Sequence, residues 1–114
     1  MDTITITSKS EMSLDLVRAR LALVCHLANG GPDRVVVDEA GGRVYIYHPA
    51  SASGERCVSQ LFLDYSSDDL AKKVVQILAD DPDLVVENDF GTTLSGDQFV
   101  ARIRSQNGWN WRII

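Results

Sequence analysis

The stretch from Asp80 to Trp111 constrains the fold more than any other part of this sequence. A short apolar run from Leu84 to Val86 predicts a strand bounded by turn-forming residues. Ser95 is then followed three residues later by Gln98, the spacing of a capping box. In such a box the serine hydroxyl accepts from the Gln98 amide and the glutamine side chain bonds back to the serine amide. This spacing predicts a helix that begins at Ser95 and ends at Asn107-Gly108.

The end of the same stretch predicts how the core closes. Leu94 and Phe99 occupy the two positions of a hydrophobic staple, a contact that fixes the direction of the chain as the helix begins. Trp109 and Trp111 are the only tryptophans of the chain. In an extended segment they would share one face. Large aromatic side chains are mostly buried, so we expect both to lie in the core.

An apolar helix is expected near the N-terminus, beginning at a Ser13 cap. Its sequence leaves few polar positions, which are Asp15, Arg18 and Arg20. A helix with so little polar surface is expected to be largely covered by the rest of the protein. It would end at Asn29 to Pro32, where glycine permits a left-handed cap and proline prevents continuation.

The remaining segments predict strands and one further helix. We expect strands at Thr3 to Thr7 (edge or near-edge), Arg34 to Glu39, Arg43 to His48, and Arg56 to Asp64 (central). The second and third of these would form a hairpin around Ala40 to Gly42. A helix would begin at Ser66 or Ser67 and end before Pro82. Pro49 to Glu55 is rich in small residues and predicts a flexible loop.

The order of these elements predicts the fold class. Strand, helix, three strands, helix, strand, helix and a short terminal strand are typical of an α+β protein. We expect one domain, residues 1–114, with a mainly antiparallel sheet and about three helices packed mainly on one of its faces. A length of 114 residues suits a single domain with its own core.

The sequence also predicts the compartment of the protein and the state of its cysteines. The apolar runs are far shorter than the ~20 residues of a membrane-spanning helix. The first ten residues lack the basic and apolar regions of a signal peptide, so we expect a cytoplasmic protein without membrane contact. Cys25, in a predicted helix, and Cys57, in a predicted strand, are expected to be reduced thiols in the core.

The negative charge is concentrated in one part of the sequence. The net charge of the chain is −5. From Cys57 to Val100, nine acids stand against Lys72 and Lys73, a net charge of −7, whereas the rest of the chain carries +2. The nine acids are Asp64, Asp68, Asp69, Asp80, Asp81, Asp83, Glu87, Asp89 and Asp97. Such a surface would repel the phosphates of nucleic acid and attract a basic protein. An ordinary solvated surface of helix starts and turns is the alternative.

Catalytic and metal-binding patterns are weak. Cys25 and His26 are neighbours, but adjacent residues of a helix point about 100° apart and would not exchange a proton. His48 lacks a second aligned group. The acids between Asp80 and Asp89 do not have the spacing or the central glycine of a calcium loop. We therefore expect no catalytic residue, no metal and no cofactor.

Tyr45 and Tyr47 alternate along one predicted strand and would point to the same face. Exposed aromatic side chains of this kind anchor protein interfaces when polar groups surround them. We therefore expect them to be the apolar part of a partner-binding surface whose charged part is Asp64, Asp68, Asp69, Asp80, Asp81, Asp83, Glu87 and Asp89.

The last third of the chain resembles a known group of small bacterial proteins. The features that it shares are the acidic helix start at Asp68 and Asp69, a helix ending in Asp81-Pro82, Asn88 to Gly91, Leu94 to Val100, and Trp109 to Trp111. This pattern is similar to that of immunity proteins of polymorphic toxins, including those of contact-dependent growth inhibition. The resemblance implies a non-catalytic cytoplasmic inhibitor, a monomer or weak dimer, that binds a cognate toxin domain, often a basic nuclease.

Two other classes remain open. A type III secretion chaperone has a similar size, acidity and order of elements, and would hold an effector segment as an obligate dimer. The predicted N-terminal strand and the closing tryptophans depart from that pattern. A small enzyme is the third class, and it would need a pocket that joins His26 or His48 to an acid.

Overall fold

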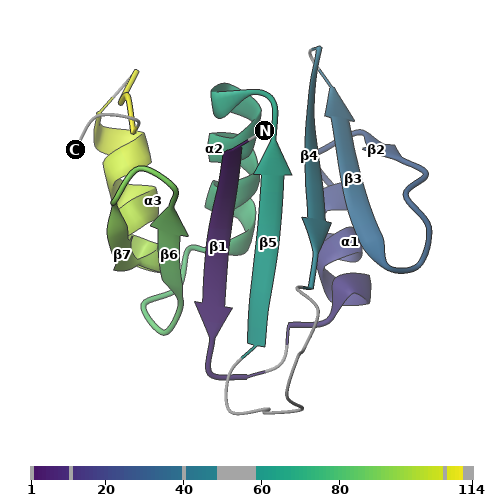
Figure 1. The fold of residues 1–114 in the computed structure, drawn as a ribbon, viewed down its shortest axis with the longest axis horizontal. Helices are drawn as coiled ribbons and strands as arrows, with labels where there is room; N and C mark the ends of the chain where they lie inside the picture. Colours follow the sequence, from purple (N-terminus) through teal and green to yellow (C-terminus); the bar gives the residue numbers. More distant parts are fainter. Residues whose placement is uncertain (1, 11, 40, 49–58, 107, 112–114) are drawn as a thin grey trace.

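The residues that the structure describes form a seven-stranded antiparallel sheet with three α-helices, which confirms the predicted α+β class (Figure 1). The computed structural model describes residues 2–10, 12–39, 41–48, 59–106 and 108–111. The predicted loop at 49–55, Cys57 and any strand after Trp111 lie outside these residues. The elements are β1 (Asp2–Ser8), α1 (Leu14–Ala22), β2 (Leu27–Ala28), β3 (Arg34–Glu39), β4 (Gly42–Tyr47), β5 (Ser59–Tyr65), α2 (Asp68–Leu78), β6 (Val85–Asn88), β7 (Thr93–Ser95) and α3 (Gly96–Ser105).

The first strand lies inside the sheet, so the prediction of an edge or near-edge strand was wrong. The strand order is β2-β3-β4-β5-β1-β6-β7, in which β1 pairs with β5 on one side and β6 on the other. Ile4, for example, is in register with Leu63 of β5 and Asn88 of β6. Alternating threonine and isoleucine indicates one buried face, but it does not show how many neighbours a strand has. The predicted central position of β5 is correct.

The two faces of the sheet differ in what covers them. All three helices lie on one face, behind the sheet in Figure 1. Alternate strand residues point to this face and are almost fully buried; they are Ile4, Ile6, Val35, Val37, Val44, Ile46, Leu61, Leu63 and Val86. The residues between them point to the opposite face, which none of the described helices covers. We call this opposite side the open face.

The first helix is shorter and more exposed than predicted. It ends at Ala22, and Leu27–Ala28 instead forms β2, paired with Val36 and Val37 of β3. Cys25 therefore follows the helix rather than lying in it. Only Val17 and Leu21 of α1 are buried, whereas Leu16, Leu23 and Val24 on or next to α1 are 60%, 84% and 54% exposed. The apolar run that contains α1 and β2 fits either a helix or a strand. Its outer side is exposed to solvent.

The second helix follows the prediction closely. It begins after Ser67, whose side chain accepts a hydrogen bond from the Leu70 amide at 3.3 Å. The buried stripe includes Leu70, Val74 and Leu78, and the helix ends four residues before Pro82. None of the helices in the described part of the chain has the length and apolar character needed to span a bilayer.

The third helix begins where predicted, but its first turn is held differently. Ser95 makes no capping bond, because its hydroxyl donates to Asp97 Oδ1 at 2.6 Å. The amides of Gly96 and Asp97 instead donate to the carbonyl oxygens of Leu84 and Asp81, at 2.8 and 3.2 Å. These main-chain acceptors replace the predicted capping box and attach α3 to the segment that joins α2 to β6.

The two tryptophans close the core beneath α3, as predicted. Trp111 is fully buried and Trp109 is 7% exposed, with their ring centroids 6.2 Å apart. Both rings contact Phe99, at 5.3 Å for Trp109 and 5.8 Å for Trp111. The Asn88 side-chain amide donates to the Trp111 carbonyl at 3.0 Å. Residues 109–111 do not form the predicted terminal strand.

The different contributions of Ser67 and Ser95 to helix stability can be measured. Ser67→Ala removes a side-chain acceptor from the first turn of α2 and should lower the free energy of unfolding by about 1 kcal/mol. Ser95→Ala should cost less than half as much, since the first amides of α3 are bonded to main-chain carbonyls. Urea unfolding of both variants would measure the two losses. Equal losses would mean that Ser95 caps α3 in solution.

Gly96 is expected to tolerate no side chain. A Cβ there would lie 2.0 Å from the Ala79 carbonyl oxygen and 2.6 Å from that of Asp81, so α3 would have to move away from the end of α2. We expect Gly96→Ala to lower the unfolding free energy by about 1–3 kcal/mol in urea titrations. Gln98→Ala, at an exposed position of the same helix, is the control and should change stability by less than about 0.5 kcal/mol.

Candidate binding surface on the open face

The open face carries one continuous row of side chains across six strands. Strand register places them opposite one another in the order Arg34, Tyr47, Phe62, Thr5, Glu87 and Thr93. A second row, directly beside the first, runs through Val36, Tyr45, Asp64 and Thr3. The β3 to β5 side of the face is therefore aromatic and charged, and the β1 to β7 side is mostly small and polar.

Three aromatic side chains, Tyr45, Tyr47 and Phe62, form a cluster that we call the aromatic patch. The rings of Tyr47 and Phe62 meet edge to face, with centroids 5.8 Å apart. The guanidinium of Arg34 lies 5.2 Å from the centroid of Tyr45. Arg43 Nη1 donates to the Tyr45 hydroxyl at 3.4 Å and also forms an ion pair with Asp38. These contacts hold both tyrosines in place on an otherwise uncovered surface.

Asp64 lies beside the aromatic patch and is held by two hydroxyl groups. Thr3 Oγ1 donates to Asp64 Oδ1 at 2.7 Å, and the Tyr47 hydroxyl donates to Oδ2 at 2.9 Å. The Thr3 amide in turn donates to Asp89 Oδ2 at 2.9 Å. The hydrogen bond to Asp64 raises the pKa of Tyr47 above its usual range, with smaller contributions from burial and from the carboxylate charge.

A shallow hollow of about 460 Å³ lies over these groups and is open to solvent. Its lining consists of Asp33, Arg34, Tyr45, Tyr47 and Asp64. Three of the ten residues predicted to bind a partner, Tyr45, Tyr47 and Asp64, therefore meet at one place. Arg34, Phe62 and Thr3 were missed by sequence reasoning. Only strand register brings them to this site.

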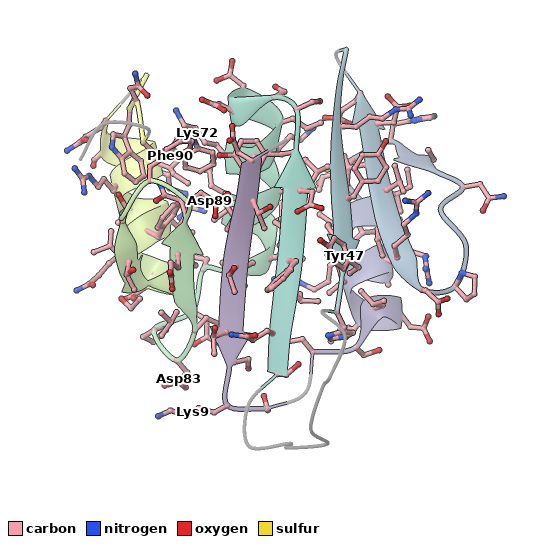
Figure 2. All side chains as sticks on the ribbon, viewed as in Figure 1. Lys9, Tyr47, Lys72, Asp83, Asp89 and Phe90 are labelled. Atoms are coloured by element: carbon pink, nitrogen blue, oxygen red, sulfur yellow. The ribbon has the colours of Figure 1, made fainter. Side chains whose placement is uncertain are left out.

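The other predicted acids are divided between the two ends of the sheet. Asp68 and Asp69 lie at the start of α2, at the same end of the sheet as Asp89. We call these three residues, together with Asp64, the upper acidic group. Asp80, Asp81 and Asp83 lie between α2 and β6, and we call them the lower acidic group. Figure 2 shows Asp89 and Asp83 at opposite ends of β6. Glu87 lies on the open face between the two groups.

The two groups lie at opposite ends of α2 and β6. The eleven residues of α2 span about 16 Å, and the four residues of β6 span about 13 Å. Screening in physiological salt acts over about 8 Å. In the lower group, Asp80 pairs with Arg104 at 3.2 Å and Asp81 Oδ1 accepts from the Asp83 amide. These contacts give part of the lower group a structural role.

His26 and His48 contact main-chain carbonyl oxygens, and Cys25 packs against the core. His26 Nδ1 lies 3.1 Å from the Asp38 carbonyl oxygen, and His48 Nδ1 lies 2.9 Å from that of Gln60. Burial raises the pKa of the Cys25 thiol and outweighs the charge of Lys73, which lowers that pKa. Among the described residues, no three Cys, His, Asp or Glu side chains are grouped so that they could hold a metal ion. The open face itself offers aromatic contact area, hydrogen-bonding groups and negative charge.

The Tyr47 to Asp64 hydrogen bond predicts a pH effect. Because the folded protein raises the pKa of Tyr47, the bond stabilises the fold below the ordinary tyrosine pKa of about 10. This stabilisation is lost as the pH rises through the raised value. Tyrosinate absorbance of the wild type minus that of Tyr47→Phe would report the titration of Tyr47. Asp64→Asn should shift it towards the ordinary value, and an unchanged midpoint would contradict the assignment.

Comparison of the chain with models of known protein families, with curated proteins and with solved structures gave no match.

Proposed function

We propose that this chain is a non-catalytic inhibitor that binds a basic protein domain through the open face of its sheet. Following the resemblance of its last third to immunity proteins, the partner is a bacterial toxin domain, most simply a nuclease. The observation that carries the proposal is the meeting of Tyr45, Tyr47 and Asp64 at one uncovered hollow. Tyr45 and Tyr47 were selected from the sequence by their alternation along one strand, and Asp64 was selected by its charge.

The composition of the hollow supports protein recognition. Tyrosine and arginine are among the residue types that contribute most to binding energy in protein interfaces. Here two tyrosines and Arg34 line one hollow, and Thr3 and Thr5 lie on the neighbouring strand. An aromatic centre with polar surroundings is the usual arrangement of an interface core and its rim.

The charge distribution supports a basic partner. The chain carries a net charge of −5, and the upper acidic group lies at the same end of the sheet as the Tyr45 to Asp64 pair. A nuclease that binds a phosphate backbone has a basic cleft, which an acidic protein can approach under electrostatic attraction. Asp64 of the upper group is hydrogen-bonded to Tyr47 of the aromatic patch, so we expect the upper group to contribute more than the lower group.

A dimeric chaperone of the type III secretion class is the second candidate. It is favoured by the apolar side chains of Leu16, Leu23 and Val24, which are exposed on or next to α1. Exposed large apolar side chains mark a protein contact where they form a contiguous patch. Sedimentation would separate the two candidates, since this class of chaperone is an obligate dimer.

The first experiment tests binding and neutralisation together. The wild-type chain is used to capture its partner from a lysate of the source bacterium, and the partner domain is then expressed alone in a bacterial host. We expect growth arrest, and recovery when this chain is coexpressed. Tyr47→Ala should abolish protection and weaken binding by about 2 kcal/mol, roughly 30-fold.

Leu23→Ala is the matched control, because it truncates an exposed apolar residue beside α1 and should leave protection intact. Loss of binding in Leu23→Ala but not in Tyr47→Ala would contradict the proposal and favour the chaperone. Asp69→Asn and Asp83→Asn each remove one exposed charge, from the upper and the lower acidic group. Stopped-flow association at low salt should slow more for Asp69→Asn than for Asp83→Asn.

A further inference from the structure

We propose that the hollow over Tyr45, Tyr47 and Asp64 receives one arginine side chain from the bound partner. The inference rests on the proposed function, which it deepens by naming the group that is recognised. Among the cavities and polar clusters of the described residues, this hollow combines a positioned carboxylate, aromatic walls and access to solvent.

The carboxylate of Asp64 has hydrogen-bond donors but no countercharge. It is partly buried, and each of its oxygens accepts a hydrogen bond from one neutral hydroxyl, of Thr3 or Tyr47. Among the described residues, no lysine, arginine or histidine nitrogen lies within 4.0 Å of it. An ionised carboxylate has about four acceptor sites, so at least one remains open on each oxygen. A partly buried charge without an opposite charge is costly, and a cation supplied by a partner would remove that cost.

The walls of the hollow suit a guanidinium better than an ammonium. Arg34 already lies over the Tyr45 ring at 5.2 Å, which indicates that this part of the sheet accommodates stacked guanidinium groups. A planar guanidinium can stack on an aromatic ring while its N–H groups bond a carboxylate in a bidentate manner, and a lysine cannot do both. The two oxygens of Asp64, each fixed by a hydroxyl, provide the matching pair of acceptors.

The charge and the size of the hollow agree with this occupant. Asp33 and Asp64 outweigh Arg34, so the lining carries a net charge of −1 and favours a cation over a phosphate group. A volume of about 460 Å³ is within the range of ligand sites. The hollow is shallow, so a free small molecule would stay largely solvated. A side chain presented by a protein would be covered by the rest of that protein.

The test needs no toxin, because it uses a small probe on the whole chain. Isotope-labelled protein is titrated with N-acetyl-arginine amide and followed by amide NMR, with the citrulline and lysine counterparts as controls. Citrulline keeps the shape of arginine but lacks its charge. We expect saturable shifts at Thr3, Tyr45, Tyr47 and Asp64, with binding about tenfold weaker for citrulline, consistent with the value of a charged hydrogen bond.

Two variants locate the site. Asp64→Asn should weaken arginine binding about tenfold, whereas Asp83→Asn, in the lower acidic group, should leave it unchanged. If Asp64→Asn alters the spectrum of the free protein widely, Tyr47→Phe replaces it, since that change removes one of the two hydroxyls that orient the carboxylate. The absence of saturable binding, equal shifts with citrulline, or shifts centred on the lower group would overturn the inference. If one of these results is found while the chain still binds its toxin, the arginine subsite is contradicted but the proposed function is not.

Discussion

The register of β1 between β5 and β6 determines which side chains enter the core and which reach the open face. Ile4 and Ile6 point towards the helices, so Thr3 and Thr5 must point the other way. A slip of one residue would exchange the two sets. Thr3 positions Asp64 through a hydrogen bond, so the geometry of the hollow depends on the same pairing that aligns the core. The candidate site and the fold therefore share one constraint.

The helices complete this division of the sheet. The first amides of α3 bond to carbonyl oxygens of the segment that joins α2 to β6, so the chain places α3 against the sheet through main-chain contacts. Trp109 and Trp111 then fill the space beneath it with Phe99, and the Lys72 ammonium donates to the Trp109 carbonyl. With all of this packing on one side, the aromatic patch on the other side is not needed to close the core.

Local patterns predicted a large part of the fold, and non-local pairing determined what they missed. The Ser67 cap, the hairpin from Arg34 and the buried tryptophans follow from short-range chemistry. β2 and β7 were missed because two or three residues carry too little periodicity to indicate a strand. For the site, alternation placed Tyr45 and Tyr47 on one face, but only strand register brings Arg34 to the hollow and Thr3 to Asp64. The acids are close in sequence, but α2 and β6 divide most of them between the two ends of the sheet, with Glu87 on the open face between them.

The strands at the two edges of the sheet contain only two and three residues, Leu27–Ala28 and Thr93–Ser95. Edges this short present little backbone for another chain to extend. Recognition would then depend on side chains that alternate with the core positions. Substitutions among those side chains could change what the protein binds while the buried half of each strand stays the same, which would allow one scaffold to diverge rapidly in specificity.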